Sequence, residues 1–349
     1  MLARGPRRGQ AGEAGGSALA LPGGRRPPLR RQGALPCRLL ACPLESLGST
    51  FADAVPQNTL RVAAFLAGLL TFLSWEMIAP HHAATASKPR RWLVNLGLAL
   101  LNGLIVTSLC AACYAIALRR MVPWRVGLFE LTAAPSWLRL PAEIGALDLL
   151  TYWLHRGYHR VPLLWRFHRV HHTDLDLDVS SASRFHFGEV LISSIAKLAF
   201  VALLGISYQG LVAFEIVLLL AAQFQHANIG VHPRLEPILW RTFVPPAMHR
   251  VHHSPEPEET DSNFGTLLVA WDRLFATFRT HTALSPPFGL WNWRDERRLG
   301  LGKMLALPFF RGCATANRVA IGVEVSVPGS EGCRAVRSQV VGQSPAAGD

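Results

Sequence analysis

Histidine is concentrated in two short parts of this 349-residue chain, and its spacing there restricts how the rest of the chain can fold. Each part contains a triplet at positions i, i+3 and i+4, and a pair at i and i+4 precedes the first triplet. Residues three and four apart share one face of a helix, so each set presents its imidazoles in one direction. In chain order these histidines are His155, His159, His168, His171, His172, His249, His252 and His253.

Two further histidines lie between the triplets. His226 and His232 are six residues apart, so one unbroken helix would not aim both at the same point. Asn228 and Gly230 permit a break, which places His226 at a helix end and His232 just past it. Imidazole binds Fe, Zn, Cu and Ni, and these ten histidines suit two ions with about four or five ligands each. The spacing therefore predicts a two-metal centre with all ten histidines as ligands.

Long apolar segments predict that the frame of this centre lies in a membrane. Half of the residues are apolar and only 17% are charged, which is low for a soluble protein. Leu60–Ala79 and Trp92–Leu118 are each long enough to cross a bilayer. A third apolar segment spans Leu140–Leu154. The block Glu189–Gln225 is too long for one span, and Gly205–Gly210 offers a turn that divides it into 190–204 and 211–225.

These segments predict an all-α fold with about four spanning or re-entrant helices, capped by a cytosolic helical domain that carries the metal site. The net charge of +12 is mostly arginine. Many arginines flank apolar segments, a pattern typical of cytoplasmic helix ends and not of nucleic-acid binding. Because the histidines gather where apolar segments end, we expect them on the cytoplasmic face of the membrane.

The composition divides the chain into three parts. Residues 1–55 are rich in Arg, Gly, Pro and Ala, and we expect this part to be disordered or to result from a start codon assigned too far upstream. Residues 56–280 form the membrane-embedded domain. Residues 281–349 are expected to be mostly disordered, with a short interfacial helix at Leu301–Phe310.

The order and spacing of the motifs resemble the fatty acid hydroxylase/sterol desaturase superfamily of membrane di-iron oxygenases. The resemblance covers roughly residues 60–280 and looks closest to the sterol desaturase branch. It rests on the histidine sets together with the following motifs: Leu164-Trp-Arg-Phe-His168, Arg184-Phe-His186, His226-Ala-Asn228, Asn263-Phe-Gly265 and Trp271-Asp-Arg-Leu-Phe275.

The resemblance implies an enzyme that hydroxylates or desaturates an unactivated C–H position of a lipid such as a sterol or fatty acyl chain. Two iron ions and O2 would supply the oxidising power, which zinc cannot because it has no redox chemistry. The sequence contains no haem, flavin or iron–sulfur motif. We therefore expect the two electrons per turnover to come from a separate ferredoxin or cytochrome b5-like partner with its reductase.

Several polar residues near the histidines are candidates for supporting roles. Asp148 lies two helical turns before His155, so it could orient that imidazole or pair with an arginine at the interface. His186 is either a ligand or a residue that supports the ligands or contacts the substrate. Hydrogen bonds that fix imidazole tautomers are the expected role of Asn228, Asn263 and Asp272. The acidic run Asp174, Asp176 and Asp178 has the pattern of a solvated loop, with binding of a basic electron donor as the alternative.

Two other kinds of protein could carry clustered histidines. A membrane protein that transports or stores metal would need ligands along its spans, whereas here they gather at segment ends. A non-redox zinc enzyme of the membrane is the other alternative, but no HExxH motif is present and no glutamate lies between paired histidines.

Overall fold

The computed structural model describes residues 45–121, 127–132, 134–280 and 287–310, and within these it leaves the side chains of 45–58, 106–121, 130 and 136 undescribed. The disorder predicted for residues 1–55 is wrong for 45–55, which form the start of α1, and the rest of that prediction lies outside the described residues, as does the disorder predicted for 311–349. Among the described residues, those from Ala52 onward form one compact unit. The helices are α1 Glu45–Ile78, α2 Lys88–Met121, α3 Leu128–Leu131, α4 Ser136–Arg160, α5 Pro162–His172, α6 Phe187–Leu204, α7 Tyr208–His226, α8 Glu236–Thr242, α9 Pro246–His252, α10 Pro257–Thr260, α11 Ala270–Leu274 and α12 Leu301–Ala306.

The described part of the chain is mostly helical and contains no strand, only two isolated bridges. Thr59–Ile78, Phe187–Leu204 and Tyr208–His226 are long and apolar enough to cross a membrane. These three helices confirm the first predicted span and both halves of the divided apolar block. The second predicted span lies within α2, a helix of 34 residues.

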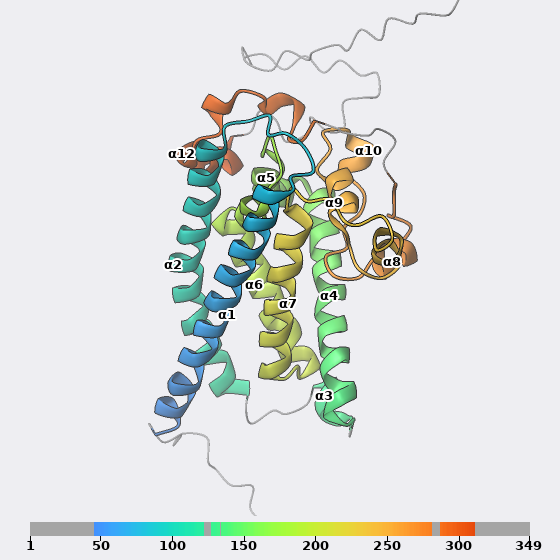
Figure 1. Cartoon of the computed structure of the whole chain (residues 1–349). Helices are drawn as coiled ribbons and strands as arrows, with labels where there is room; N and C mark the ends of the chain where they lie inside the picture. Colours follow the sequence, from blue (N-terminus) through green and yellow to red (C-terminus); the bar gives the residue numbers. More distant parts are fainter. Residues whose placement is uncertain (1–44, 122–126, 133, 281–286, 311–349) are drawn as a thin grey trace, which may run out of the picture. The chain divides into compact units, whose positions relative to one another are not determined.

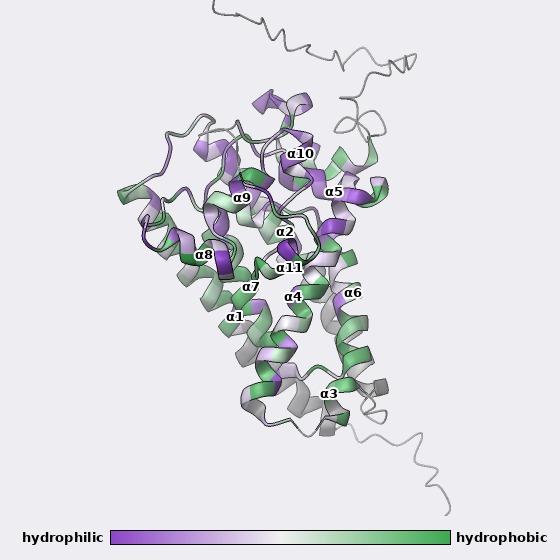
Figure 2. Ribbon diagram, turned by 90° about the vertical axis from the view of Figure 1, so that its right-hand side faces the viewer, coloured by the Kyte–Doolittle hydropathy of each residue, from purple (hydrophilic) through white to green (hydrophobic). Residues whose placement is uncertain are grey.

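The long helices α1, α2, α4, α6 and α7 run roughly alongside one another (Figure 1). Hydrophobic residues dominate these helices, while hydrophilic residues gather at the end that carries α5, α9 and α10 (Figure 2). Apolar side chains such as Leu70, Leu100 and Leu203 are exposed on the helices. Exposed leucines along a helix suit a lipid environment.

Local sequence explains the two turns that matter most for the site. Proline disfavours a helical conformation in the residue before it, so α4 ends at Arg160, Val161 is extended and Pro162 begins α5. Between α6 and α7, Gly205 adopts a left-handed conformation with φ of 68°. The Ser207 hydroxyl then accepts a hydrogen bond from the Gly210 N–H at the start of α7. This is the turn that the sequence predicts at 205–210.

The folded domain continues beyond the predicted boundary at residue 280. Leu299, Met304 and Leu307 pack in one buried cluster with Val94 and Leu98 of α2. Val170 of α5 completes this cluster. The predicted helix at 301–310 is present as α12 and a short 3₁₀ turn, with Met304 and Leu307 in the core and Leu301 and Leu305 partly buried against it. Short helices give weak periodicity, which explains why the sequence pattern understates this segment.

The prediction of a solvated acidic loop is wrong. Asp174, Asp176 and Asp178 are each 1% exposed. Arg91 of α2 lies between them, donating to Asp174 at 2.5 Å and to Asp178 at 2.7 Å. Asp178 also caps the 3₁₀ helix η1 (Val179–Ser183). The acidic run therefore ties the segment between α5 and α6 to the start of α2.

Candidate metal centre

Nine of the ten predicted ligands come together in two buried groups. Within each group, one ring nitrogen of every histidine lies within 4.8 Å of those of all the others. We name the groups after one member each. The His155 group consists of His155, His159, His168, His172 and His252, and the His226 group consists of His171, His226, His249 and His253. The groups of five and four match the expected division between two ions.

Each histidine triplet is divided between the two groups. On α5, His168 and His172 join the His155 group, while His171 joins the His226 group. In the second triplet, which begins on α9, the two outer members His249 and His253 join the His226 group. Only the middle member, His252, joins the His155 group. Positions i+3 and i+4 lie about 100° apart around a helix, with position i between them. One short helix can therefore supply ligands to two neighbouring ions.

The Nε2 atoms of neighbouring histidines approach each other closely. The distance from His226 Nε2 is 3.1 Å to His171 Nε2 and 3.0 Å to His249 Nε2. His253 Nε2 lies 3.1 Å from His249 Nε2, and His172 Nε2 lies 3.2 Å from His168 Nε2. Two ligands at ~2.1 Å from one ion would be separated by about 3.0–3.4 Å. These contacts are therefore the size of the edges of a coordination shell.

The opposite ring nitrogens are fixed by hydrogen-bond acceptors. Nδ1 donates to a backbone carbonyl at 2.9 Å in His155, 2.7 Å in His226 and 2.8 Å in His252. The acceptors are the carbonyls of Phe264, Ala222 and Ser262. A proton on Nδ1 leaves the lone pair of a neutral imidazole on Nε2, the tautomer that binds a metal.

Carboxylates take the same role for two other histidines of the His155 group. His168 Nδ1 lies 2.7 Å from Glu189 Oε1, and His159 Nδ1 lies 3.3 Å from Asp261 Oδ1. A carboxylate acceptor raises the basicity of the ligand histidine and orients its ring. Asp261 and Ser262 both belong to the segment that follows α10. This segment and Phe264 therefore orient three of the five imidazoles of the group.

Burial favours the neutral form of five histidines on or next to α5 and α9. It lowers the pKa of His171, His172, His249 and His253 well below 6.5, and neighbouring imidazoles lower these pKa values further. Burial likewise brings the pKa of His252 to about 3, although its hydrogen bond to the Ser262 carbonyl opposes the shift. At neutral pH these rings carry free lone pairs and can bind a cation without first losing a proton.

The donor set fits a metal on its own chemistry. The Nε2 atoms of His155, His159 and His252 are buried and have no hydrogen-bond partner among the described residues. Buried polar atoms are rarely left unpaired, because an unpaired group costs about 1–3 kcal/mol. Three such atoms directed at one point are explained by a cation that accepts all three lone pairs.

His232 is the one predicted ligand that the fold does not bring to the centre. It is exposed, lies outside both groups, and its Nδ1 accepts a hydrogen bond from the Arg234 N–H at 3.2 Å. The reason is the extended segment that follows His226, which carries the chain to the surface before α8 begins. His226 alone ends α7, as predicted, and it alone of this pair reaches the site.

The predicted supporting residues act on the backbone and not on the imidazoles. His186 is buried outside both groups, where its Nδ1 accepts from the Gly188 N–H at the start of α6 and its Nε2 lies 3.1 Å from the Leu305 carbonyl. Asn228 exchanges hydrogen bonds with the backbone of His82. Both residues therefore position elements of the frame and do not fix a ligand tautomer.

Asp148, Asn263 and Asp272 hold the loop between α10 and α11. Asp148 accepts from the backbone of Leu267 and Leu268 and from Trp271 Nε1, so neither expected role, orienting a histidine or pairing with an arginine, is found. Asp272 accepts from the N–H groups of Phe264 and Gly265. Asn263 has a φ of 53° and bonds the backbone of Met248 and Arg279. They reach His155 only through the Phe264 carbonyl.

Glu189 is the functional residue that the pattern of histidines misses. It is 5% exposed in the first turn of α6, a mostly apolar helix in which Lys197 is the other charged residue. A carboxylate inside an apolar segment is costly and is usually paired. The sequence signal for a role of Glu189 at the site is this charge in an apolar segment, three residues after the Arg184-Phe-His186 motif.

We expect Glu189→Ala to lower metal affinity and product formation about 10- to 100-fold, because His168 loses the acceptor that orients its ring. Glu189→Gln should have a metal affinity between those of Glu189→Ala and the wild type, because its amide oxygen can still accept a hydrogen bond from His168 Nδ1. Metal content after dialysis against a chelator measures the effect. Glu258→Gln, a change at an exposed carboxylate that pairs with Arg279, serves as the control. Equal metal retention in Glu189→Ala and Glu258→Gln would contradict the assigned role.

Comparison with known proteins relates this centre to lipid-modifying enzymes. Residues 141–277 match the family model described as fatty acid hydroxylase. Alkylglycerol monooxygenase of Xenopus tropicalis is 32% identical over 151 residues, which are 43% of this chain and 32% of that protein. Ornithine lipid hydroxylase OlsE of Rhizobium tropici is 32% identical over 127 residues, 36% of this chain and 38% of that protein.

A more distant relative belongs to another reaction class. The very-long-chain aldehyde decarbonylase GL1-4 of Oryza sativa subsp. indica is 24% identical over 186 residues, 51% of this chain and 28% of that protein. The chain thus spans about a third of the length of the curated relatives it matches. No solved structure matches it.

The matched region contains nearly all of the site. It runs from the start of α4 through α11 and contains all nine clustered histidines together with Glu189 and Asp261. With its two histidine groups, this region is similar to the fatty acid hydroxylase family and to curated lipid hydroxylases.

Proposed function

We propose that this protein is a membrane-bound oxygenase that hydroxylates an unactivated C–H position of a lipid, with one iron ion in each histidine group. The observation that carries the proposal is the convergence of nine buried imidazoles, in groups of five and four, where apolar helices end. Iron is proposed because imidazole ligands suit it and because zinc has no redox chemistry. When bound, a pair of irons would supply the oxidising power that amino-acid side chains lack.

The protein's own residues would hold and shield this centre. The histidines of the two groups keep Nε2 free for the metal, while Nδ1 in five of them faces a carbonyl or carboxylate. Aromatic rings close the surroundings, with Phe185 stacked on His171 at 4.4 Å between ring centroids and Phe264 packed against His155. A site with little exposure to water protects a reactive centre from side reactions.

The names of the relatives favour hydroxylation over desaturation. The alkylglycerol and ornithine lipid enzymes are a monooxygenase and a hydroxylase, and both names specify a lipid. The preference for the sterol desaturase branch stays a prediction from the sequence. We therefore propose an amphiphilic membrane lipid as the substrate class and insertion of oxygen as the reaction.

The proposal places the substrate partly in the bilayer. The apolar helix α7 ends at His226, and the apolar helix α6 begins at Phe187 with Glu189 in its first turn. The last residue of α7 and the first turn of α6 therefore both lie at the site. A lipid tail could lie along the helices with its reactive carbon at the interface. We propose that this end faces the cytoplasm, where a separate ferredoxin or cytochrome b5-like protein with its reductase would deliver electrons.

Two measurements test the proposal. The purified full chain should contain one iron per histidine group, and lipid extracts from cells that express it should contain a species heavier by one oxygen atom than in cells without it. Mass spectrometry of the extracts identifies the lipid and distinguishes hydroxylation from the loss of two hydrogens. Zinc in place of iron, with no change in any lipid, would reject the proposal in favour of a zinc enzyme or a metal-handling protein.

A further inference from the structure

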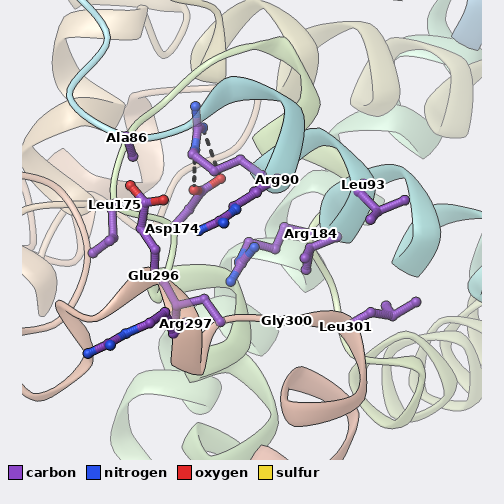
Figure 3. Close-up of a pocket in the computed structure, with 13 residues that line it drawn as sticks. Ala86, Arg90, Leu93, Asp174, Leu175, Arg184, Glu296, Arg297, Gly300 and Leu301 are labelled. Carbon is purple, nitrogen blue, oxygen red and sulfur yellow. Dashed lines mark hydrogen bonds and ion pairs between the residues drawn. The ribbon is translucent and has the colours of Figure 1, made fainter.

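A pocket of about 330 Å³ lies between the start of α2, the acidic segment after α5 and the segment that leads into α12 (Figure 3). None of the histidines of either group lines it. Its polar lining is dominated by four arginines, Arg90, Arg91, Arg184 and Arg297. Figure 3 shows the side chains of Arg90 and Arg184 extending toward the same central space.

Two of these arginines already have carboxylate partners. Arg91 forms ion pairs with Asp174 and Asp178, and Arg297 forms one with Asp295. Asp174, which also lines the pocket, accepts from Arg91, Asn95 and Ser181. Its charge is therefore already compensated within the network around Arg91.

Arg90 and Arg184 form no ion pair with any residue that the structure describes. Arg184 is only 1% exposed, and its guanidinium donates to neutral groups: the Val170 carbonyl, Asn95 Oδ1 and the Thr173 hydroxyl. Asp174 attracts this guanidinium electrostatically but forms no ion pair with it. An anion in the pocket would give the buried charge a direct partner and would stabilise this arrangement. Glu296, the second carboxylate in the lining, accepts from the Ser87 N–H.

The remaining surroundings are apolar and lead toward the membrane. Leu93, Leu299 and Leu301 contribute to the walls. Leu93 lies one helical turn after Arg90 and is 73% exposed, and Leu100 and Leu104 continue the exposed face along α2. Arginines where an apolar helix begins lie at the level of lipid headgroups. The pocket thus joins a cationic interior to a strip of leucine that suits an acyl chain.

We propose that this pocket binds the phosphate group of an anionic lipid, with Arg90 and Arg184 as its counter-ions. The planar guanidinium of arginine matches phosphate oxygens in geometry and charge, which favours phosphate over a simple carboxylate. The exposed leucines of α2 favour a lipid as the source of this phosphate over a free phosphate ester. The site is separate from the histidine groups and does not depend on the reaction assigned to them.

The test uses the purified full chain in neutral detergent and native mass spectrometry. The probes are dioleoyl phosphatidic acid, dioleoylglycerol and soluble glycerol 3-phosphate. We expect the wild type to retain phosphatidic acid in preference to dioleoylglycerol, and Arg90→Gln to retain about fivefold less, as expected for one basic residue near an anionic headgroup. Arg298→Gln, a change in a nearby arginine that does not line the pocket, should bind like the wild type.

Each comparison in this binding experiment has a distinct interpretation. Displacement of phosphatidic acid by equimolar glycerol 3-phosphate would identify a soluble phosphate ester as the ligand of the same site. Equal retention of phosphatidic acid and dioleoylglycerol by the wild type would overturn the proposal without reference to any variant. Undiminished retention by Arg90→Gln would overturn it as well. Iron content of each variant shows that the fold around the histidines is intact.

Discussion

The His252→Ala variant is expected to lose the iron of the His155 group and to lose product formation by about 100-fold or more. His252 is fully buried and is the only member of its triplet that joins this group. Its Nδ1 donates to the Ser262 carbonyl, which leaves Nε2 directed at the neighbouring imidazoles. The measurements are iron per chain by elemental analysis and the oxygenated lipid by mass spectrometry.

The matched control is His232→Ala. Sequence spacing gives both histidines the same predicted role, but the structure leaves His232 exposed and outside both groups. We expect this variant to keep its iron and its activity. Because the ligands of the His226 group are untouched in His252→Ala, that variant should also keep part of its iron. Full activity in His252→Ala, or an equal loss in His232→Ala, would contradict the assignment of the two groups.

The clustered histidines could be predicted because their signal is local. Spacings of three and four residues bring side chains together within one helix, whatever the rest of the chain does. The division of each triplet between the two histidine groups is not local. It depends on how α5 and α9 approach each other, as shown by His172 and His253, whose rings stack at 4.5 Å between centroids although they belong to different groups. Sequence spacing contains no information on that approach.

The supporting polar residues could not be assigned for the same reason. Asp148 lies at the right spacing to face His155, yet its hydrogen-bond partners are backbone N–H groups about 120 positions later in the chain. Asp174 has the pattern of a solvated residue, and its partner Arg91 lies 83 positions earlier. Helix, turn and span boundaries follow from neighbouring residues. Hydrogen bonds between distant segments follow only from the complete fold.

Arg91→Ala is expected to lower the free energy of unfolding by about 3–5 kcal/mol, because it removes the guanidinium that forms ion pairs with two buried carboxylates, Asp174 and Asp178. Arg91 is 6% exposed and its guanidinium contacts Asp174, Asp178, the Asp176 carbonyl and the Ser181 hydroxyl. Reversible unfolding in detergent, followed by helical circular dichroism, measures the change. Arg90→Ala alters the adjacent, exposed arginine and should have little effect on stability in the absence of lipid.

The pH dependence of the same variants separates loss of charge from loss of packing. Burial alone would raise the pKa of Asp174, but the charges of Arg91 and Arg184 outweigh it and hold that pKa well below its usual value. A carboxyl group whose pKa is lowered by folding stabilises the protein at pH values above its unfolded-state pKa. This stabilisation is lost as the pH falls through the folded-state pKa. In Arg91→Ala, Asp174 loses the larger of these two favourable charges, so its pKa should rise, and the cost of burying its charge is relieved as the pH falls and it becomes protonated. The difference in stability between wild type and variant should therefore shrink with acidification. A difference independent of pH would show that the arginine acts through packing. The buried acidic run would then lose its role as the electrostatic anchor between α2 and the helix that carries three of the clustered histidines.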